Sequence, residues 1–337
     1  MKVSFLAECV TSLRYFFPII RALKTLDHDI EVFYPIDGTG LKKYNSSIRN
    51  LQTFAKRINQ VFPDVLLTPA PSDRPPINTD VLFTLECIPR GLDGIIFNYD
   101  KKFCVQHGTD YTNFIQYVDD KTTYITHDKC FQDDLKQNFG INAICPDVPV
   151  AFWDINTQLK LIKSNKIDIN NKNIAYIFYP DHGYKELAKK LVLYLSELGL
   201  TVIIKQRRKH QAVENLSIEN VYMIYDDIWY PSEAVTLPAI SSLCIGFSSA
   251  AYTDLAAAGI NYIDLAIEPY SKCRSEAISD SEWPGYIKPK DRDNFYYLPT
   301  ENFEVIQESL SGILKNNITQ KFENNDTIGE KFLENIL

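Results

Sequence analysis

Short apolar runs alternate with amphipathic helical patterns along the first half of the chain. Lys2–Leu6 and Ile30–Tyr34 have the length and composition of strands, and the apolar residues of Leu13–Leu26 recur at helical spacing. Strands that alternate with helices predict a parallel sheet covered by helices on both faces. The same half contains predicted strands at 64–68, 80–84, 94–98, 103–106 and 122–126 and predicted helices at 42–61 and 128–139.

A second alternation begins at Asn173, after a stretch that is typical of a domain boundary. Two prolines within 145–152 end the first alternation, and a polar helical pattern at 157–164 and a run rich in Asn, Asp and Lys at 165–173 follow. Beyond them, strands are predicted at 173–179, 201–205, 220–225, 243–246 and 261–265, and helices at 184–198, 231–240, 248–258, 304–315 and 327–337.

The chain is therefore predicted to be an α/β protein with two Rossmann-like, doubly wound parallel-sheet domains. The first spans residues 1–152, the second spans 173–315, and a linker at 153–172 joins them. The last segment, 316–337, contains a helix that can cross back to the first domain. Two such domains are expected to face each other across a cleft, with ligands at the carboxyl ends of the strands.

An alanine-rich helical pattern follows the predicted strand 243–246 and starts at Ser248 and Ser249. The two hydroxyls, the N–H groups of the first helical turn and the positive end of the helix dipole would together bind a phosphate or a carboxylate. Asp254 lies within this pattern, and Gly259 ends it as a left-handed C-cap. The alternative interpretation is that Ser248 is only the N-cap of the helix.

Charge restricts the class of ligand. The chain has 43 acidic and 35 basic residues, a net charge of −8, which disfavours nucleic acid as a main partner. A local basic run nevertheless follows the predicted strand 201–205, and its Lys205, Arg207 and Arg208 fit a pyrophosphate or a phosphate diester, with His210 beside them. A solvated surface turn is the alternative for this run.

The cysteines and the apolar runs bear on where the protein acts. The seven cysteines form no C-x-x-C pair and most lie in apolar runs, so we expect reduced core residues and no zinc site. The apolar N-terminal run is interrupted by Glu8 and Arg14, and no stretch approaches the ~20 apolar residues of a membrane-spanning helix. A cytoplasmic protein is expected, with at most peripheral contact at the inner face of the cytoplasmic membrane.

His107 is the candidate catalytic residue. It follows the predicted strand 103–106 directly, at the carboxyl edge of the first sheet. Histidine suits general-base catalysis near neutral pH, and Gly108, with Thr109 after it, lets a ligand approach the backbone closely. A histidine at a strand end that only forms structural hydrogen bonds is the alternative interpretation.

Further polar residues at predicted strand ends are candidate ligand contacts. Glu8 follows the first strand, and Glu268 follows the strand 261–265, where a carboxylate can accept hydrogen bonds from a ribose or a sugar. Both are also explained as solvated loop residues. A helix start at Asp181, His182 and Gly183 is another candidate anion contact, although Asp181 can equally be the N-cap. Asp226 and Asp227 are the only acidic pair retained as a metal candidate.

Several motifs are missing from the sequence. It has no phosphate-loop motif, no G-x-G-x-x-G after the first strand, no H-E-x-x-H and no G-x-S-x-G. Their absence disfavours phosphate-loop ATPases, classical dinucleotide-dependent dehydrogenases, zincins and serine hydrolases.

The order of elements resembles the two-domain glycosyltransferases of the GT-B architecture. More narrowly, it is similar to bacterial surface-polysaccharide enzymes, namely the CDP-glycerol glycerophosphotransferase group and the capsule and lipopolysaccharide transferases for acidic sugars. Gln106–Thr109 resembles their His-Gly element, Thr122–Asp147 the end of their first domain, and Lys205 through Gly246–Ser249 to Asp254 and Gly259 their donor-binding half. One departure is that this chain has Gln-Arg-Arg at 206–208, where those groups usually have His-Pro.

The resemblance implies a transferase that moves a sugar or a polyol phosphate from a nucleotide-activated donor to a glycan or lipid-linked acceptor. Such a reaction belongs to capsule, lipopolysaccharide or teichoic-acid-like polymer synthesis. His107 would be the general base, and Lys205, Arg207, Arg208, Ser248, Ser249 and Asp254 would bind the donor, with no cofactor and no metal. Two alternatives remain, a UDP-N-acetylglucosamine 2-epimerase-like enzyme of the same fold and a non-catalytic protein that binds nucleotide sugars or glycans.

Overall fold

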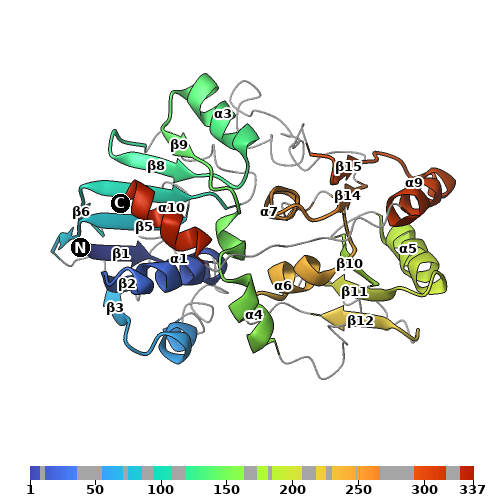
Figure 1. Ribbon diagram of the computed structural model, residues 1–337, viewed down its shortest axis with the longest axis horizontal. Coiled ribbons are helices and arrows are strands. Elements are labelled where there is room, and N and C mark those ends of the chain that lie inside the picture. Colours follow the sequence, from blue (N-terminus) through green and yellow to red (C-terminus); the bar gives the residue numbers. More distant parts are fainter. Residues whose placement is uncertain are drawn as a thin grey trace. The chain divides into compact units, whose positions relative to one another are not determined.

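The computed structural model describes residues 1–7, 12–35, 55–70, 75–85, 95–107, 118–162, 173–180, 184–206, 218–224, 230–247, 249, 251–265, 292–315 and 327–337. The chain forms two compact units, Met1–Asp154 with Asn324–Leu337, and Ile155–Glu323. Each unit is built on one large parallel sheet with helices around it (Figure 1). The predicted α/β fold with two Rossmann-like domains is confirmed.

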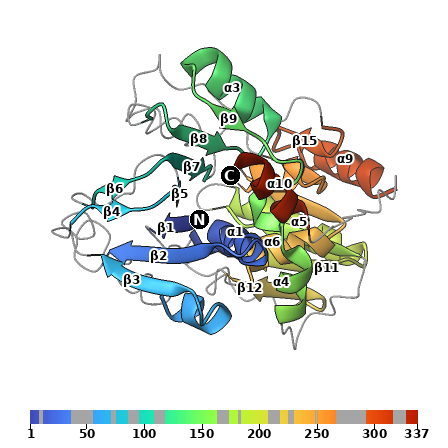
Figure 2. The same ribbon diagram turned by 60° about the vertical axis from the view of Figure 1, so that its left-hand side comes forward.

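The first unit contains a seven-stranded parallel sheet in the order β3-β2-β1-β5-β7-β8-β9 (Figure 2). The order runs outward from β1 in one direction and from β5 in the other, so the topological switch point lies between these two strands. β4 (Ile77–Asn78) and β6 (Phe97–Asn98) form a separate two-stranded sheet. The strands of the large sheet are β1 (Lys2–Leu6), β2 (Asp29–Pro35), β3 (Leu66–Ala70), β5 (Val81–Leu85), β7 (Lys101–Val105), β8 (Thr122–Ile125) and β9 (Ala143–Ile144).

Phenylalanine rings connect the three central strands of this sheet. Phe5 of β1 is the register partner of Phe83 of β5, which in turn is the partner of Phe103 of β7. Their rings stack with centroids 5.0 and 5.2 Å apart, and Phe16 packs edge-on against Phe5 at 5.1 Å. Such ring pairs add about 0.5–1.5 kcal/mol each beyond the burial of their surface. This phenylalanine ladder therefore aligns β1, β5 and β7 and holds the helix of Phe16 against them.

Helices from both ends of the chain pack together on the first unit. Phe16 belongs to α1 (Leu13–Thr25), and the C-terminal α10 (Ile328–Ile336) lies against α1 (Figures 1 and 2). Lys101 Nζ donates hydrogen bonds to the carbonyl oxygens of Ile336 and Leu337 at 3.1 and 2.7 Å. The unit also contains a helix at 55–61, α3 (Lys129–Phe139) and the short 3-10 helix η4 (Val150–Phe152).

The second unit contains a six-stranded parallel sheet in the order β12-β11-β10-β13-β14-β15. Its switch point lies between β10 and β13, the equivalent of β1 and β5 in the first unit. The strands are β10 (Ile174–Phe178), β11 (Thr201–Lys205), β12 (Val221–Ile224), β13 (Leu243–Gly246), β14 (Tyr262–Asp264) and β15 (Phe295–Tyr297), and the helices are α4 (Ile155–Leu161), α5 (Lys185–Glu197), α6 (Glu233–Ile240), α7 (Tyr252–Ala257) and α9 (Phe303–Lys315).

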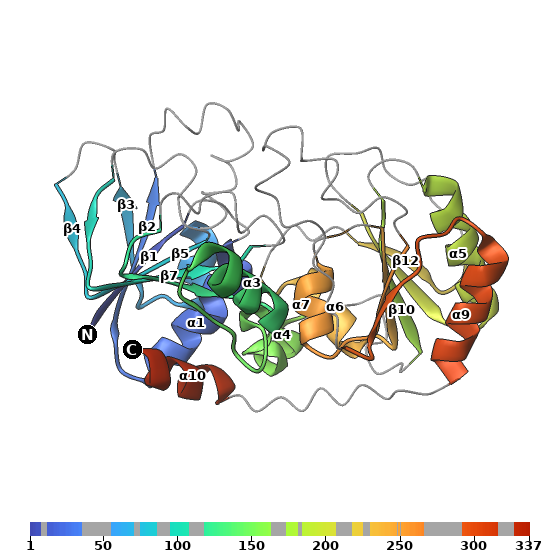
Figure 3. The ribbon, with the colours of Figure 1, turned by 90° about the horizontal axis from the view of Figure 1, so that it is seen from above.

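Helices cover both faces of this second sheet. Ala175 and Ile177 of β10 belong to the apolar core with α5 and α9, which lie side by side in Figure 3. Tyr194 of α5 joins these two helices, because its hydroxyl is 3.1 Å from that of Ser311. Tyr176, which lies between Ala175 and Ile177, donates a hydrogen bond to a carbonyl oxygen of α6 on the opposite face. No helix within the described residues is long and apolar enough to cross a membrane.

Two glycine-to-alanine changes should have opposite effects on stability. A Cβ at Gly329 of α10 would lie 2.7 Å from Cε3 of Trp153, so Gly329→Ala forces a shift and should cost about 1–3 kcal/mol of unfolding free energy. A Cβ at Gly312 of α9 meets no heavy atom within 4 Å, so Gly312→Ala should gain about 0.5–1 kcal/mol. Urea unfolding followed by circular dichroism measures both, and equal effects would contradict the packing of α10.

Candidate functional site

Two histidines follow neighbouring strands at the carboxyl edge of the first sheet. His107 comes after β7 and His127 after β8, and these strands pair in parallel. Gln106, which precedes His107, is fully buried, and its Oε1 accepts a hydrogen bond from the backbone N–H of His127 at 3.0 Å. This hydrogen bond ties the ends of β7 and β8 together and so places the two histidines next to each other.

Tyr15, in the first turn of α1, contacts both imidazoles. Its ring lies edge-on to that of His107, with centroids 6.1 Å apart, and stacks on that of His127 at 5.5 Å. Tyr15 and His127 are each only 2% exposed, whereas His107 is half-buried. Of the two imidazoles, that of His107 is therefore the more accessible to a ligand. Its role as a general base stays a prediction.

Sequence reasoning missed the contribution of Tyr15 and His127. His127 directly follows the predicted strand 122–126, which is the same signal that singled out His107. Tyr15 carried no signal of its own, because it fits the apolar pattern of an amphipathic helix. Only the packing of α1 on the sheet brings the tyrosine to the strand ends.

A glycine at the end of β13 shapes the carboxyl edge of the second sheet. A Cβ at Gly246 would lie 1.7 Å from Oη and 2.6 Å from Cζ of Tyr262 on the neighbouring β14. Tyr262 is fully buried and stacks on Phe295 of β15, with ring centroids 6.0 Å apart. The ring cannot move aside easily, so this position requires glycine, and the chain leaves β13 directly beneath the tyrosine hydroxyl.

The helix predicted to start at Ser248 and Ser249 starts later. Helix α7 begins at Tyr252 with Ala251 as its N-cap, because a turn follows β13 first. Ser249 belongs to this turn, since its Oγ accepts from the N–H of Ala251 at 3.5 Å and its carbonyl oxygen accepts from the N–H of Tyr252 at 3.1 Å. Ser248 lies outside the described residues. The binding of a donor phosphate by the two serines stays a prediction.

Lys205 lies at the carboxyl end of β11, as the sequence predicts. Its Nζ is 5.7 Å from the ring centroid of Phe178, its register partner on β10. A cation–π contact of this kind holds the ammonium group at the sheet edge. The other basic residues of that run, including Arg207, Arg208 and His210, lie outside the described residues. The same holds for the candidate contacts Glu8, Gly108, Thr109, Asp181, His182, Gly183 and Glu268 and for the acidic pair Asp226 and Asp227.

Aromatic residues lie at the same edge of the second sheet, where Phe247 is buried and Tyr184 and Tyr297 are half-buried. Tyr184, whose φ of 45° is left-handed, stacks on Phe247 after β13 at a centroid distance of 5.6 Å. Tyr297 ends β15, and its pKa is raised by burial and by the nearby Asp264 and Tyr184. Its phenol therefore stays neutral and can donate a hydrogen bond near pH 7. Aromatic faces with such donors suit the stacking of a nucleobase or a sugar.

Asp254 lies in the first turn of α7 and is only 4% exposed. All six residues of this helix are buried, so the carboxylate is part of the packing beneath the turn at Ser249. Its contribution to donor binding stays a prediction. Within the described residues, no group of three or more His, Cys, Asp or Glu side chains is placed to hold a metal ion.

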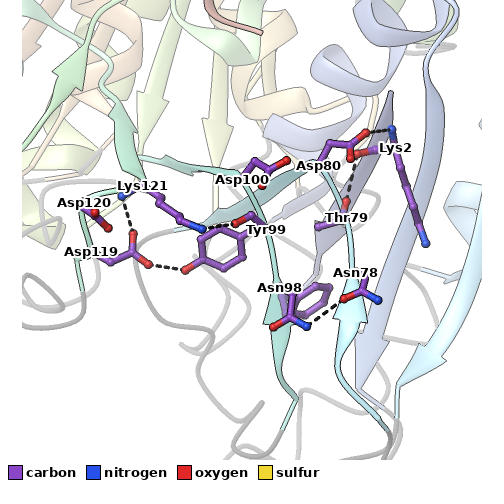
Figure 4. A pocket seen from close by; sticks show the side chains of 11 residues that line it. Lys2, Asn78, Thr79, Asp80, Asn98, Tyr99, Asp100, Asp119, Asp120 and Lys121 are labelled. Atoms are coloured by element: carbon purple, nitrogen blue, oxygen red, sulfur yellow. Dashed lines mark hydrogen bonds between the residues drawn. The ribbon is translucent and has the colours of Figure 1, made fainter.

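A pocket of ≈ 700 Å³ opens at the opposite, amino edge of the first sheet (Figure 4). Polar groups that line it form hydrogen bonds with one another. Asp80 accepts a hydrogen bond from the backbone N–H of Lys2 at 2.8 Å, and Asp119 accepts one from the hydroxyl of Tyr99 at 2.6 Å. Burial alone would raise the pKa of Asp119, but hydrogen bonds from Thr122 and Tyr99 hold it below its ordinary value. We interpret these contacts as a structural network that fixes the strand starts, because ligands of open α/β sheets bind at the carboxyl edge.

Comparison with known proteins shows the fold alone. No protein-family model and no curated protein matches the chain. A putative UDP-N-acetylglucosamine 2-epimerase from Listeria monocytogenes has a TM-score of 0.56 at 11% identity, over 99% of this chain and 95% of its own. The UDP-GlcNAc 2-epimerase from Neisseria meningitidis, solved with UDP-GlcNAc bound, has a TM-score of 0.54 at 12% identity, over 100% and 99%. MurG from Acinetobacter baumannii has a TM-score of 0.45 at 10% identity, over 98% and 94%.

Replacing Tyr15 by leucine should disturb both histidines at the first sheet edge. Tyr15→Leu keeps an apolar side chain but removes both ring contacts, so it should cost roughly 1–3 kcal/mol of unfolding free energy. The proton NMR signals of His107 and His127 should move, because the ring current of Tyr15 is lost. His28, which immediately precedes β2, is the internal control. Unchanged signals for His107 and His127 would show that the three rings are not in contact.

Proposed function

We propose that the chain is a transferase that moves a sugar, or a polyol phosphate, from a nucleotide-activated donor to a hydroxyl group of a glycan or lipid-linked acceptor. The observation that carries this proposal is the position of His107, half-buried at the carboxyl end of β7 and packed against Tyr15. The fold supports a nucleotide-activated donor, since the Neisseria meningitidis protein of this fold was solved with UDP-GlcNAc bound.

His107 is proposed to act as the general base. It takes the proton of the acceptor hydroxyl while that oxygen forms its bond to the anomeric carbon, or to the phosphorus of a polyol phosphate. A positioned base of this kind accelerates transfer by about 10²–10⁴-fold. Tyr15 keeps the imidazole in place through its edge-on contact, and the buried His127 stacks on the tyrosine ring.

The second domain is proposed to hold the donor. As the acceptor bond forms, the leaving nucleotide takes up negative charge. In sugar transfer the bond between the anomeric carbon and the phosphate oxygen breaks, and in polyol-phosphate transfer the bond between the polyol phosphorus and the bridging oxygen of the nucleotide phosphate breaks. Lys205, Arg207 and Arg208 and the hydroxyls of Ser248 and Ser249 bind that phosphate, with Asp254 in the helix behind them. Fixed cations and hydrogen-bond donors stabilise a leaving phosphate without a metal ion, so we propose a metal-independent reaction without a cofactor.

The remaining candidate contacts complete the proposal. The resemblance of the sequence to capsule and lipopolysaccharide transferases supports a role in polymer synthesis, in the cytoplasm or at the inner face of the cytoplasmic membrane. The sugar, the ribose and the acceptor are proposed to contact Glu8, Gly108, Thr109, Asp181, His182, Gly183, His210 and Glu268.

His107→Ala should lower the turnover number by at least about 100-fold and leave the donor affinity unchanged, because only the proton acceptor is lost. Steady-state transfer kinetics and calorimetry with the donor measure the two effects. His28→Ala is the matched control, because His28 immediately precedes β2, at the amino edge of the same sheet, and should behave as wild type. Wild-type turnover in His107→Ala would refute the assignment of the base.

A sugar-nucleotide epimerase is the second candidate, because the Listeria and Neisseria structures with TM-scores of 0.56 and 0.54 carry epimerase names. Incubation with UDP-N-acetylglucosamine and no acceptor separates the two activities. A transferase should leave the sugar unchanged or hydrolyse it slowly, whereas conversion to the 2-epimer would replace our proposal. If nucleotides raise the melting temperature of the protein but no donor and acceptor pair reacts, the chain is a binding protein instead.

A further inference from the structure

Helix α1 begins at the topological switch point of the first sheet. It follows β1, whose neighbour β5 starts the other half of the strand order. In sheets of this kind the helix that follows the strand at the switch point presents its N-terminus to the ligand. The helix has 13 residues, and its first four N–H groups have no acceptor within the helix itself.

Ser12, the N-cap residue of α1, has an unusual environment. Its side chain is fully buried, yet its hydroxyl has no hydrogen-bond partner within the described part of the chain. The backbone of Ser12 is helical, with φ −57° and ψ −29°, so the side chain does not cap the helix either. A buried hydroxyl without a partner destabilises the fold, and its presence at a helix start is explained if a ligand supplies the partner.

The charge of the first turn also fits an anion. Helices favour acidic residues at their N-terminus, but the first turn of α1 contains none and has the half-buried Arg14 instead. Tyr15, three residues after Ser12 and therefore on the same side of the helix, contacts the imidazole of His107. Ser12, Arg14 and Tyr15 thus all belong to the start of α1, and Tyr15 connects this helix start to His107 at the carboxyl edge of the sheet.

From these observations we infer that the start of α1 binds an anionic group, a phosphate or a carboxylate, of the acceptor substrate. The assignment of this anion to the acceptor rests on the proposed function, in which the phosphate of the donor is bound by the second domain. The acceptor class is then a phosphorylated or acidic glycan or lipid whose anion is held by Ser12 and Arg14 while its hydroxyl faces His107.

Titration with inorganic phosphate, followed by the proton NMR signals of the histidines at constant pH and ionic strength, tests the site without catalysis. In the wild type, the signals of His107 and His127 should move with phosphate, whereas that of His28 should not. Ser12→Ala and Arg14→Gln should each weaken the phosphate affinity read from His107 by about tenfold, the typical loss of one hydrogen bond to a charged group. Glycerol 3-phosphate should act as phosphate does, and glycerol should have no effect.

Ser4→Ala is the matched control. Ser4, in the middle of β1, is also fully buried and its hydroxyl also lacks a hydrogen-bond partner among the described residues. Without phosphate, Ser4→Ala and Ser12→Ala should both keep or raise the melting temperature, because each removes an unsatisfied hydroxyl. Only Ser12→Ala should lose phosphate affinity. A large drop in the melting temperature of Ser12→Ala without phosphate would show that the hydroxyl serves the fold and would overturn the inference.

The remaining outcomes separate this inference from the proposed function. Unchanged phosphate affinity in both Ser12→Ala and Arg14→Gln, or signals that move only for the histidines of the second domain, would refute the anion site and leave the transferase proposal intact. Conversely, loss of phosphate affinity in both variants together with wild-type turnover in His107→Ala would support the anion site and refute the catalytic base.

Discussion

The phenylalanine ladder of the first domain is the interaction on which the candidate site depends. Phe5, Phe83 and Phe103 are register partners on β1, β5 and β7, so their stacking aligns the carboxyl ends of these strands. Phe16 packs on the same ladder and fixes α1. Since Tyr15 is its neighbour in sequence, the ladder also determines where the tyrosine ring meets the two histidines. If one of these strands shifted, the side chains of Tyr15, His107 and His127 would separate, because they come from α1 and from the ends of β7 and β8.

The same strand order in both domains explains why polar residues gather where they do. In each sheet the strand order reverses beside the first strand, and ligands of open α/β sheets bind at the carboxyl ends of the strands at this point. The edge of the first sheet has imidazoles and the start of α1, whereas that of the second has Lys205, the turn at Ser249 and aromatic rings. In the proposed function, the first set removes a proton from the acceptor and the second binds the departing nucleotide.

Most strands and helices could be predicted from the sequence because parallel strands buried on both faces are continuous apolar runs. Gly140, Gly199 and Gly259 end their helices with positive φ, as helix-stop signals require. The strand Phe295–Tyr297 was missed, since its residues are only half-buried and lie at the sheet edge. The grouping of Tyr15, His107 and His127 could not be predicted, because it depends on how α1 packs, and the unpartnered hydroxyl of Ser12 is a property of the folded chain alone.

The C-terminal helix α10 also holds α1 in place, so the candidate site depends on residues at both ends of the sequence. Gly329 lies so close to Trp153 and to Ala22 of α1 that no side chain fits between them, and Phe332 packs on the same tryptophan at a ring distance of 5.3 Å. α10 therefore supports α1 from the side while the phenylalanine ladder holds it from the sheet. Because Tyr15 lies in the first turn of α1, residues near 330 help to set the geometry around His107, although they are more than two hundred positions away in the chain. A change in α10 can thus alter the candidate site without touching any of its residues.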